Sequence, residues 1–105
     1  MNSNNQILIL EKNTIKGNTP LHNSAESGHF RICELISNNV TNKNPDNDQR
    51  VSALHVAVEN GHFEITELII KSVKNKIYED CRGKTPLHIA VEQGNFEKIS
   101  ELILY

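Results

Sequence analysis

The sequence is poor in aromatic residues, and this shortage excludes a class of protein. Its 105 residues contain no Trp, three Phe and two Tyr. A chain of this length forms one small domain, and 37% apolar residues favour a thin, elongated core. We therefore do not expect a large globular core that encloses a deep catalytic chamber.

Cysteine and long hydrophobic runs are also scarce. Cys33 and Cys81 are the two cysteines, and because no signal peptide is recognisable they fit a reducing compartment. The apolar run from Ile7 to Leu10 is too short for a secretory signal or a membrane span. We expect a cytoplasmic protein, with the nucleus as the alternative location, and no membrane partner.

An excess of positive charge is absent as well. The chain has 11 Lys and Arg against 13 Asp and Glu, a formal net charge of −2 and a pI near 6.2. A protein that neutralises the phosphates of a nucleic acid needs a basic surface. Nucleic acid is therefore not an expected partner.

The sequence does contain a short motif that returns twice. Thr-Pro-Leu-His stands at residues 19–22, Ser-Ala-Leu-His at 52–55 and Thr-Pro-Leu-His at 85–88, so each copy follows the last by 33 residues. Other residues keep the same interval, namely Gly28, Gly61, Gly94, Phe30, Phe63 and Phe96. A fixed period of about 20 to 50 residues indicates a solenoid, in which each unit buries its apolar face against its neighbours.

Each repeat carries the signals of two short helices. Thr19, Ser52 and Thr85 are suited to N-cap a helix, and Pro20 and Pro86 stand at the first helical position. The repeated glycines then end this first helix after about two turns. A second segment has apolar residues at the i, i+3, i+4 spacing of one helical face. These residues are Ile32, Leu35 and Ile36, and then Ile65, Leu68 and Ile69.

These residues and the period of 33 resemble the ankyrin repeat, whose recurring motif is Thr-Pro-Leu-His-x-Ala-Ala-x-x-Gly-His. The best matches are residues 85–90 with Gly94, and residues 55–57 with Gly61 and His62, and the resemblance spans about residues 14–105. It implies an all-α fold, an ankyrin-repeat solenoid of stacked helix-turn-helix units joined by β-hairpin-like finger loops. It also implies a protein-binding surface with no catalysis of its own and no cofactor.

The resemblance also divides the chain. Residues 1–16 form an N-terminal flank and partial finger. Repeats follow at 17–49, 50–82 and 83–105, the last of them incomplete.

Three departures from the ankyrin pattern predict local changes. Val40 and Val73 stand where the family has a helix-ending Gly, so the second helix should run on or the start of the finger should be remodelled. Arg50 stands where the other repeats have a turn glycine, Gly17 and Gly83. We therefore expect the tight turn of the finger that contains Arg50 to be disturbed. In residues 96–103 the apolar spacing slips by one, which predicts a rotated last helix.

Five histidines raise the hypothesis of a metal site, and their spacing argues against it. His22 and His29 lie seven residues apart across a helix end, which does not place two imidazoles on one face, and neither cysteine falls in a zinc pattern. No metal ligand is therefore predicted. The resemblance implies instead that His22, His55 and His88 link neighbouring backbone groups through both ring nitrogens.

Catalytic patterns are missing too, so we predict that the chain is not an enzyme. Ser24, Ser27 and Ser52 are explained by capping or by small-residue packing, and no strand-turn-helix nucleophile elbow is present. The five glycines all mark repeat positions, so none belongs to a phosphate-binding loop.

One side of the predicted stack is a candidate binding surface. Glu26, Glu59 and Glu92 share one position of the first helices and should form an acidic ladder, although each could merely solvate its helix. Beside the ladder, a row of residues becomes apolar toward the C-terminus. The predicted protein-binding residues are Lys16, Asn18, Asn23, Glu26, Ser27, Gln49, Val51, Val56, Glu59, Asn60, Arg82, Lys84, Ile89, Glu92 and Gln93.

The leading functional hypothesis is a non-catalytic protein-protein interaction module, an adaptor or scaffold. Its concave face, formed by fingers and first helices, would bind a partner protein with a basic surface. The chain would act as a monomer or as part of a longer array. Two alternatives remain: a substrate-recruitment or targeting segment of a larger multidomain enzyme such as a ubiquitin ligase or kinase, and a structural spacer in a long array.

Overall fold

The computed structural model describes residues 16–94 and 96–104, and helices are the only regular elements in this part of the chain. The predicted all-α class is confirmed. The N-terminal flank predicted for residues 1–16 lies outside the described residues except for Lys16. The helices are α2 (Pro20–Ser27), α3 (Phe30–Ser37), α4 (Ala53–Glu59), α5 (Phe63–Ser72), α6 (Pro86–Gln93) and α7 (Phe96–Leu104).

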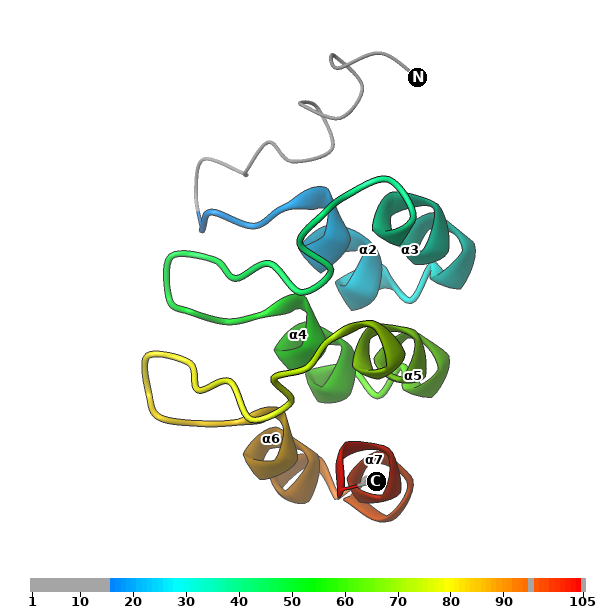
Figure 1. The fold of residues 1–105 in the computed structure, drawn as a ribbon. Helices are drawn as coiled ribbons and strands as arrows, with labels where there is room; N and C mark the ends of the chain where they lie inside the picture. The colour runs from blue at the N-terminus through cyan, green and yellow to red at the C-terminus, as the bar shows by residue number, and fades with distance from the viewer. Residues whose placement is uncertain (1–15, 95, 105) are drawn as a thin grey trace.

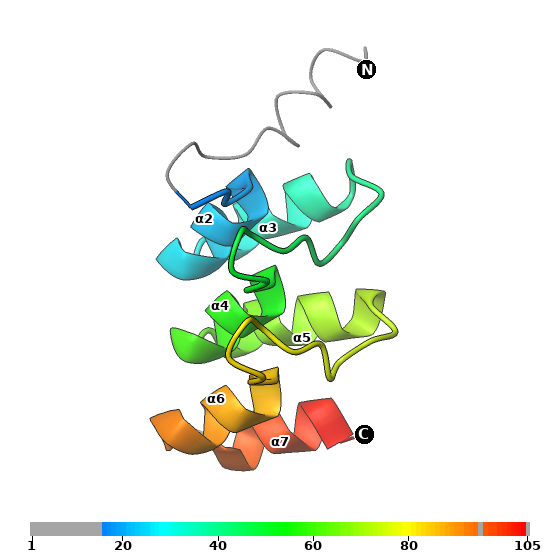
Figure 2. The same ribbon diagram turned by 90° about the vertical axis from the view of Figure 1, so that its left-hand side faces the viewer.

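The helices form two parallel columns. In Figure 1, α2, α4 and α6 stack in one column and α3, α5 and α7 in the other, and Figure 2 shows the same three layers from the side. We call the pairs α2/α3, α4/α5 and α6/α7 units 1, 2 and 3. The loops between units, which we call fingers, project away from the first column on one side (Figure 1). The stack is elongated, with extents of 41 × 25 × 23 Å.

The first helix of each unit begins as predicted. Thr19, Ser52 and Thr85 are the N-caps, and each hydroxyl accepts a hydrogen bond from the backbone N–H three residues later. The residue at that later position is the repeated His, whose Nδ1 accepts in return from the backbone N–H of the cap. A histidine therefore completes the capping box that Glu or Gln usually completes.

The turn after α2 favours glycine through both its backbone conformation and its close packing. Gly28 has a φ of 79° and ends the helix in the left-handed conformation. A Cβ on Gly28 would lie 2.7 Å from the His62 ring. The His62 ring in turn reaches the Glu26 carbonyl, with 3.1 Å between Nε2 and O. The glycine thus lets the turn of unit 1 rest directly on unit 2.

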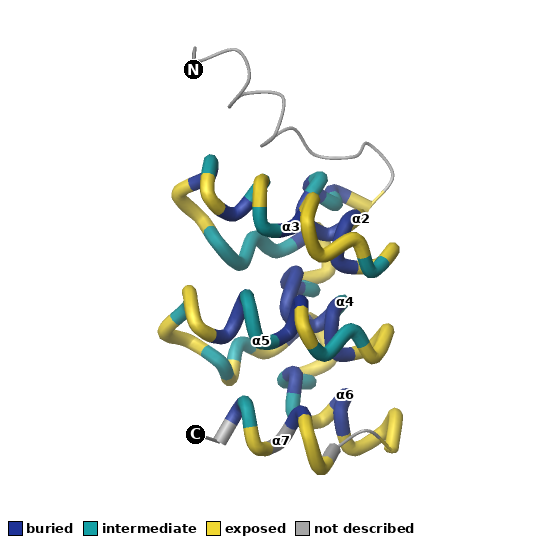
Figure 3. Tube along the Cα trace, turned by 90° about the vertical axis from the view of Figure 1, so that its right-hand side faces the viewer, coloured by how far each residue is buried: buried dark blue, intermediate teal, exposed yellow. Residues whose placement is uncertain are grey.

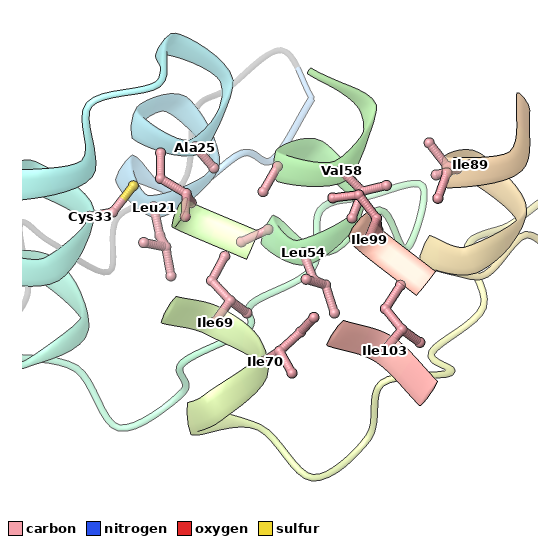
Figure 4. Packing of buried hydrophobic residues seen from close by; sticks show 14 residues of the cluster. Leu21, Ala25, Cys33, Leu54, Val58, Ile69, Ile70, Ile89, Ile99 and Ile103 are labelled. Carbon is pink, nitrogen blue, oxygen red and sulfur yellow. The ribbon is translucent and has the colours of Figure 1, made fainter. Parts of the chain in front are cut away.

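The core lies between the two columns and continues from unit to unit. Figure 4 shows side chains from successive helices, among them Leu21, Leu54, Ile69 and Ile103, gathered into one cluster. Leu54 is fully buried, and burying such a side chain stabilises a fold by about 1.5 to 3 kcal/mol. Buried residues recur along the whole stack (Figure 3), so each unit depends on its neighbours for part of its core.

The first departure from the ankyrin pattern changes where the second helices end. The α5 helix runs to Ser72 and is followed by Val73 in an extended conformation, with φ −120° and ψ 148°. The shorter α3 ends at Ser37, and Val40 is buried. Neither second helix ends in the left-handed residue that a Gly would supply. Unit 2 instead has a longer second helix, and the backbone at the start of both fingers differs from the ankyrin pattern.

The finger turn at Arg50 is retained, so the prediction that this turn would be disturbed is wrong. Arg50 has a φ of 61°, close to the 73° of Gly17 and the 76° of Gly83. Its N–H donates to the Asn47 carbonyl at 3.0 Å, as the Gly83 N–H donates to the Asp80 carbonyl at 2.9 Å. Since a left-handed backbone costs a residue with a Cβ about 1 to 2 kcal/mol, the surrounding hydrogen bonds hold Arg50 in this turn.

The predicted slip in the last helix is also wrong. Ile99 and Ile103 are buried, and they stand 33 residues after Thr66 and Ile70, which are buried too. The register therefore continues without rotation. The residue that changes is Lys98, which takes the place of the buried Ile65 and stays exposed, with its Nζ 5.6 Å from the centroid of the Phe63 ring. This arrangement is a cation–π contact.

Candidate protein-binding groove

Each finger is built around one polar side chain at its tip. Asn47 Oδ1 accepts from the backbone N–H groups of Gln49 (2.9 Å) and Val51 (3.0 Å). One period later, Asp80 Oδ1 accepts from Arg82 (2.9 Å) and Lys84 (3.0 Å). Local bonds of this kind fold a short polar segment into a turn. They place the backbone of both fingers in the same shape.

Consecutive fingers are also joined to each other. The Asp48 N–H donates to the Lys16 carbonyl at 3.1 Å, and the Cys81 N–H donates to the Gln49 carbonyl at 2.9 Å. Asn47 adds a side-chain bond from its Nδ2 to Asn18 Oδ1 at 2.9 Å. The fingers therefore form a continuous wall along one side of the first-helix column.

The histidines join the first helices in the same way. His22 Nε2 lies 2.8 Å from the Val51 carbonyl oxygen, and His55 Nε2 lies 2.8 Å from that of Lys84. Because an amide N–H donates to each Nδ1 and a carbonyl accepts at each Nε2, both rings are neutral with the proton on Nε2. The links that the resemblance implied are thus confirmed for these two histidines. Burial lowers the pKa of His55 further, which favours the neutral ring.

A groove of about 510 Å³ lies between the finger wall and the first helices. It runs past units 1 and 2 and ends beside the second finger. Half-buried Val51 and Val56 supply its apolar part. Its lining residues are Lys16, Asn18, Glu26, Asn47, Gln49, Val51, Val56, Glu59, Asn60, Cys81 and Arg82.

Comparison with protein families agrees with this architecture. A family model described as ankyrin repeats in three copies matches residues 2–78 and 40–105. The chain belongs to the ankyrin-repeat family. No curated protein gives a significant match. Ankyrin repeats are generally protein-protein interaction modules, and the family is typically non-catalytic.

Most of the residues predicted from the ankyrin pattern line the groove, and a smaller group does not. Asn23, Ser27 and Gln93 are exposed but lie outside its lining. Lys84 and Glu92 line a separate hollow at the far side of α6. Ile89 was expected in the exposed row with Val56, but it is buried at 4% exposure and packs in the core. The apolar part of this ankyrin groove therefore comes from Val51 and Val56.

Two lining residues were not predicted. Asn47 and Cys81 were treated only as parts of turn-rich segments, although Asn47 stands one period before Asp80. This shared repeat position is the sequence signal that could have identified Asn47, because Asn47 and Asp80 shape their fingers in the same way. Cys81 is a free, exposed cysteine at the tip of the second finger, and no pattern around it indicates that it faces a groove.

Ion pairs change the charge of the predicted acidic ladder. Glu92 Oε2 lies 2.6 Å from Lys84 Nζ, so its charge is largely offset. Glu26 and Glu59 are exposed, and neither has an ion-pair partner in the described part of the chain. The acidic surface is therefore concentrated on Glu26 and Glu59, next to Val56.

Arg82 contributes less positive charge than its position suggests. Its Nη2 lies 2.8 Å from Oδ2 of the buried Asp80. Burial alone would raise the pKa of Asp80, but the hydrogen bonds from Arg82 and from the Lys84 and Arg82 backbone outweigh it, so this pKa lies below its usual value. Asp80 is thus an anion beside the Arg82 cation, and the two charges offset each other.

The described residues show no arrangement suited to metal binding. No group of three or more His, Cys, Asp or Glu side chains within residues 16–94 and 96–104 could hold an ion. His22 and His55 use both ring nitrogens for structural bonds. Within the same residues, no helix is long and apolar enough to cross a membrane. The chemistry that the groove offers is recognition by hydrogen bonds, charge and a small apolar contact.

Proposed function

We propose that this chain is a non-catalytic adaptor whose groove binds a segment of another protein. The observation that carries the proposal is the groove itself, an open hollow of about 510 Å³ whose lining combines exposed charges with half-buried Val51 and Val56. Binding sites of this kind join an apolar centre with a polar rim. The two free cysteines support a reducing location such as the cytoplasm.

The charges of the groove favour a basic residue on the partner. Glu26 and Glu59 lie on the helix side without an ion-pair partner in the described residues. On the finger side Arg82 is offset by Asp80, which leaves Lys16 as the one cation against the two glutamates among the described lining residues. A Lys or Arg of the bound segment would reach the two glutamates, and a neighbouring apolar side chain would rest on Val56. Exposed charges act mainly on the rate of association, and salt screens them.

The proposal is tested with a library of random peptides displayed on phage and selected against the whole chain. We expect the selected peptides to share a Lys or Arg next to an apolar residue. Synthetic copies, labelled with a fluorophore, are then measured by anisotropy against two groove variants. Glu59→Lys should weaken binding about tenfold or more, equivalent to about 1.4 kcal/mol, and should slow association. Val56→Ala should mainly speed dissociation.

A matched control separates the groove from the opposite side of the molecule. Glu101 is an exposed glutamate on α7, in the second-helix column, and Glu101→Lys makes the same change of charge away from the groove. It should leave peptide binding unchanged. If Glu59→Lys and Val56→Ala bind like the parent chain while Glu101→Lys abolishes binding, the binding face is the second-helix side and the proposal is wrong.

A further inference from the structure

The starts of the two fingers form a hollow of their own, between units 1 and 2. Residues 41–44 follow α3 and residues 72–75 lie at the end of α5, and Figure 2 shows these two segments one above the other. Together with Tyr78 they line an open hollow of about 300 Å³, which we call the finger-base hollow. Among the described residues, it shares no lining residue with the groove.

The charge of the finger-base hollow is positive in a chain whose net charge is −2. Lys43 and Lys74 line it, and no described acidic residue does. Lys43 is held in place, because its Nζ donates to the Ser37 and Val40 carbonyls, and a third N–H remains on its ammonium group. Lys74 is exposed and has no ion-pair partner in the described part of the chain.

The helix ends beside the hollow reduce this charge without cancelling it. The carbonyl ends of α3 and α5 each contribute about half of a negative charge. Each lysine contributes a full positive charge, so the hollow stays positive.

Three asparagines add neutral donors to the two cations. The side-chain oxygen of each accepts from a backbone N–H: Asn42 from Asn44 at 3.1 Å, Asn44 from Leu54 at 2.8 Å, and Asn75 from Ile77 at 3.1 Å. Each side-chain nitrogen carries two N–H donors, and none of these donors has an acceptor within the described residues. What the asparagines have left for a ligand is therefore mainly N–H groups.

We infer that the finger-base hollow binds a phosphate or sulfate group. Such an oxyanion offers several acceptor oxygens and a negative charge, which match a hollow that offers cations and N–H donors. Hydrogen bonds from a charged donor to an oxyanion are also about twice as strong as neutral ones. The Tyr78 hydroxyl takes no part, because it donates to Asp46.

The oxyanion has two possible sources, a free ion and a phosphorylated side chain of another protein. Both fit the hollow, since Lys74 and Asn75 are exposed and leave it open to solvent. The inference goes beyond the proposed function, because the groove takes no part in it. The two can therefore succeed or fail separately.

Nuclear magnetic resonance of the whole chain, labelled with nitrogen-15, tests the inference because it observes side-chain NH₂ groups directly. Sodium phosphate is titrated at pH 7.5, and sodium chloride keeps the ionic strength constant. The NH₂ signals of Asn42, Asn44 and Asn75 should shift along a saturable curve. Those of Asn18 and Asn60, which line the groove, should stay in place.

Two variants each remove one feature of the hollow. Lys74→Gln removes the exposed cation and should weaken phosphate binding about tenfold. Asn75→Asp keeps the oxygen that accepts from the Ile77 N–H but replaces the donor by a charged oxygen, so it should abolish binding. Lys98→Gln and Asn23→Asp make the same changes at exposed positions outside the hollow and should bind phosphate like the parent. Circular dichroism should show parental helicity for all four.

A short peptide with one phosphoserine, and its unphosphorylated copy, distinguish the two sources. If the phosphoserine peptide saturates the three NH₂ signals at a lower concentration than inorganic phosphate does, the ligand is a phosphorylated protein. If it needs an equal or higher concentration, the ligand is the free ion. The inference is wrong if phosphate gives no saturable shift of these signals, if the groove signals shift as much, or if the folded Asn75→Asp variant binds like the parent.

Discussion

His55 Nε2 donates a hydrogen bond to the Lys84 carbonyl across 2.8 Å, and this bond joins the buried centre of unit 2 to the first residues of unit 3. The other ring nitrogen accepts from the Ser52 N–H at 3.1 Å. Both bonds exist together only when the ring is neutral, because a proton on Nδ1 would face the amide N–H.

This relationship makes stability depend on pH. Burial lowers the pKa of His55 in the folded chain, while the unfolded chain takes up its proton near the ordinary value of about 6.5. The unfolded state therefore binds more protons just below that value, and stability is full above it and falls as the pH drops. In urea titrations at a series of pH values, the unfolding midpoint should fall as the pH is lowered from 7.5 to 5.

The variant His55→Gln identifies the responsible group. It should cost about 1 to 3 kcal/mol at pH 7.5, because one side chain no longer satisfies both the Ser52 N–H and the Lys84 carbonyl. The remaining stability should vary less with pH than that of the parent chain. A profile as steep as the parental one would show that another group controls the acid response.

Burial along the stack predicts unequal costs for the same truncation. Leu54→Ala removes a fully buried side chain from the central unit and should cost about 2 to 5 kcal/mol. Leu87→Ala, at the half-buried equivalent position of unit 3, should cost clearly less. Chemical denaturation in dilute solution measures both. Equal costs would mean that Leu87 is as fully packed as Leu54.

The left-handed turn at Arg50 predicts a stabilising substitution. With φ at 61°, Arg50→Gly should raise stability by about 1 kcal/mol, because glycine adopts this conformation without Cβ strain. Arg50→Val is the control, since it loses the same side chain but keeps the strain. Denaturation midpoints should rank Gly above Arg and Arg above Val. Should glycine and valine give the same midpoint, the backbone conformation is not the cause.

One finger lacks a bond that its neighbour has. Asn44 Oδ1 accepts from the Leu54 N–H at 2.8 Å, which fastens the first finger to α4. The equivalent residue one period later is Ile77, which is 71% exposed and leaves the Leu87 N–H without an acceptor among the described residues. Ile77→Asn should therefore stabilise the chain by about 0.5 to 1.5 kcal/mol. Thermal unfolding by circular dichroism measures the gain.

The reverse change supplies the control for this fastening. Asn44→Ala should destabilise the chain by about 1 to 3 kcal/mol, because the Leu54 N–H loses its acceptor in a partly buried site. The double variant Ile77→Asn/Leu87→Pro cannot gain the bond, because proline has no N–H. A gain from Ile77→Asn that persists in that background would have another origin.

The sequence was sufficient for the parts of the fold that depend on local chemistry. The caps at Thr19, Ser52 and Thr85 and the left-handed end at Gly28 need only a side chain and its immediate backbone. A period of 33 residues then carried the same local solution along the chain, and most of the groove followed from it.

The errors arose where the outcome depends on neighbours in space. Ile89 shares its repeat position with Val56, but Ile89 is buried and Val56 is half-buried. The burial of a side chain depends on the packing around it, and the repeat spacing does not show that packing. The pairing of Glu92 with Lys84 depends on how two long side chains meet across a finger, which spacing alone does not define. Ile99 was assigned to the wrong register, because one helical stripe can be counted in two ways when Lys98 interrupts it.

The two rows of bonds between units have a mechanical meaning. Each junction is fastened at the finger, as by Cys81 to Gln49, and again at the helix, as by His55 to Lys84. One point of attachment would act as a pivot, whereas two points set apart resist torsion of one unit against the next. These bonds therefore fix the width of the groove in the free chain, and a segment bound as proposed above would lose little affinity to the ordering of the groove.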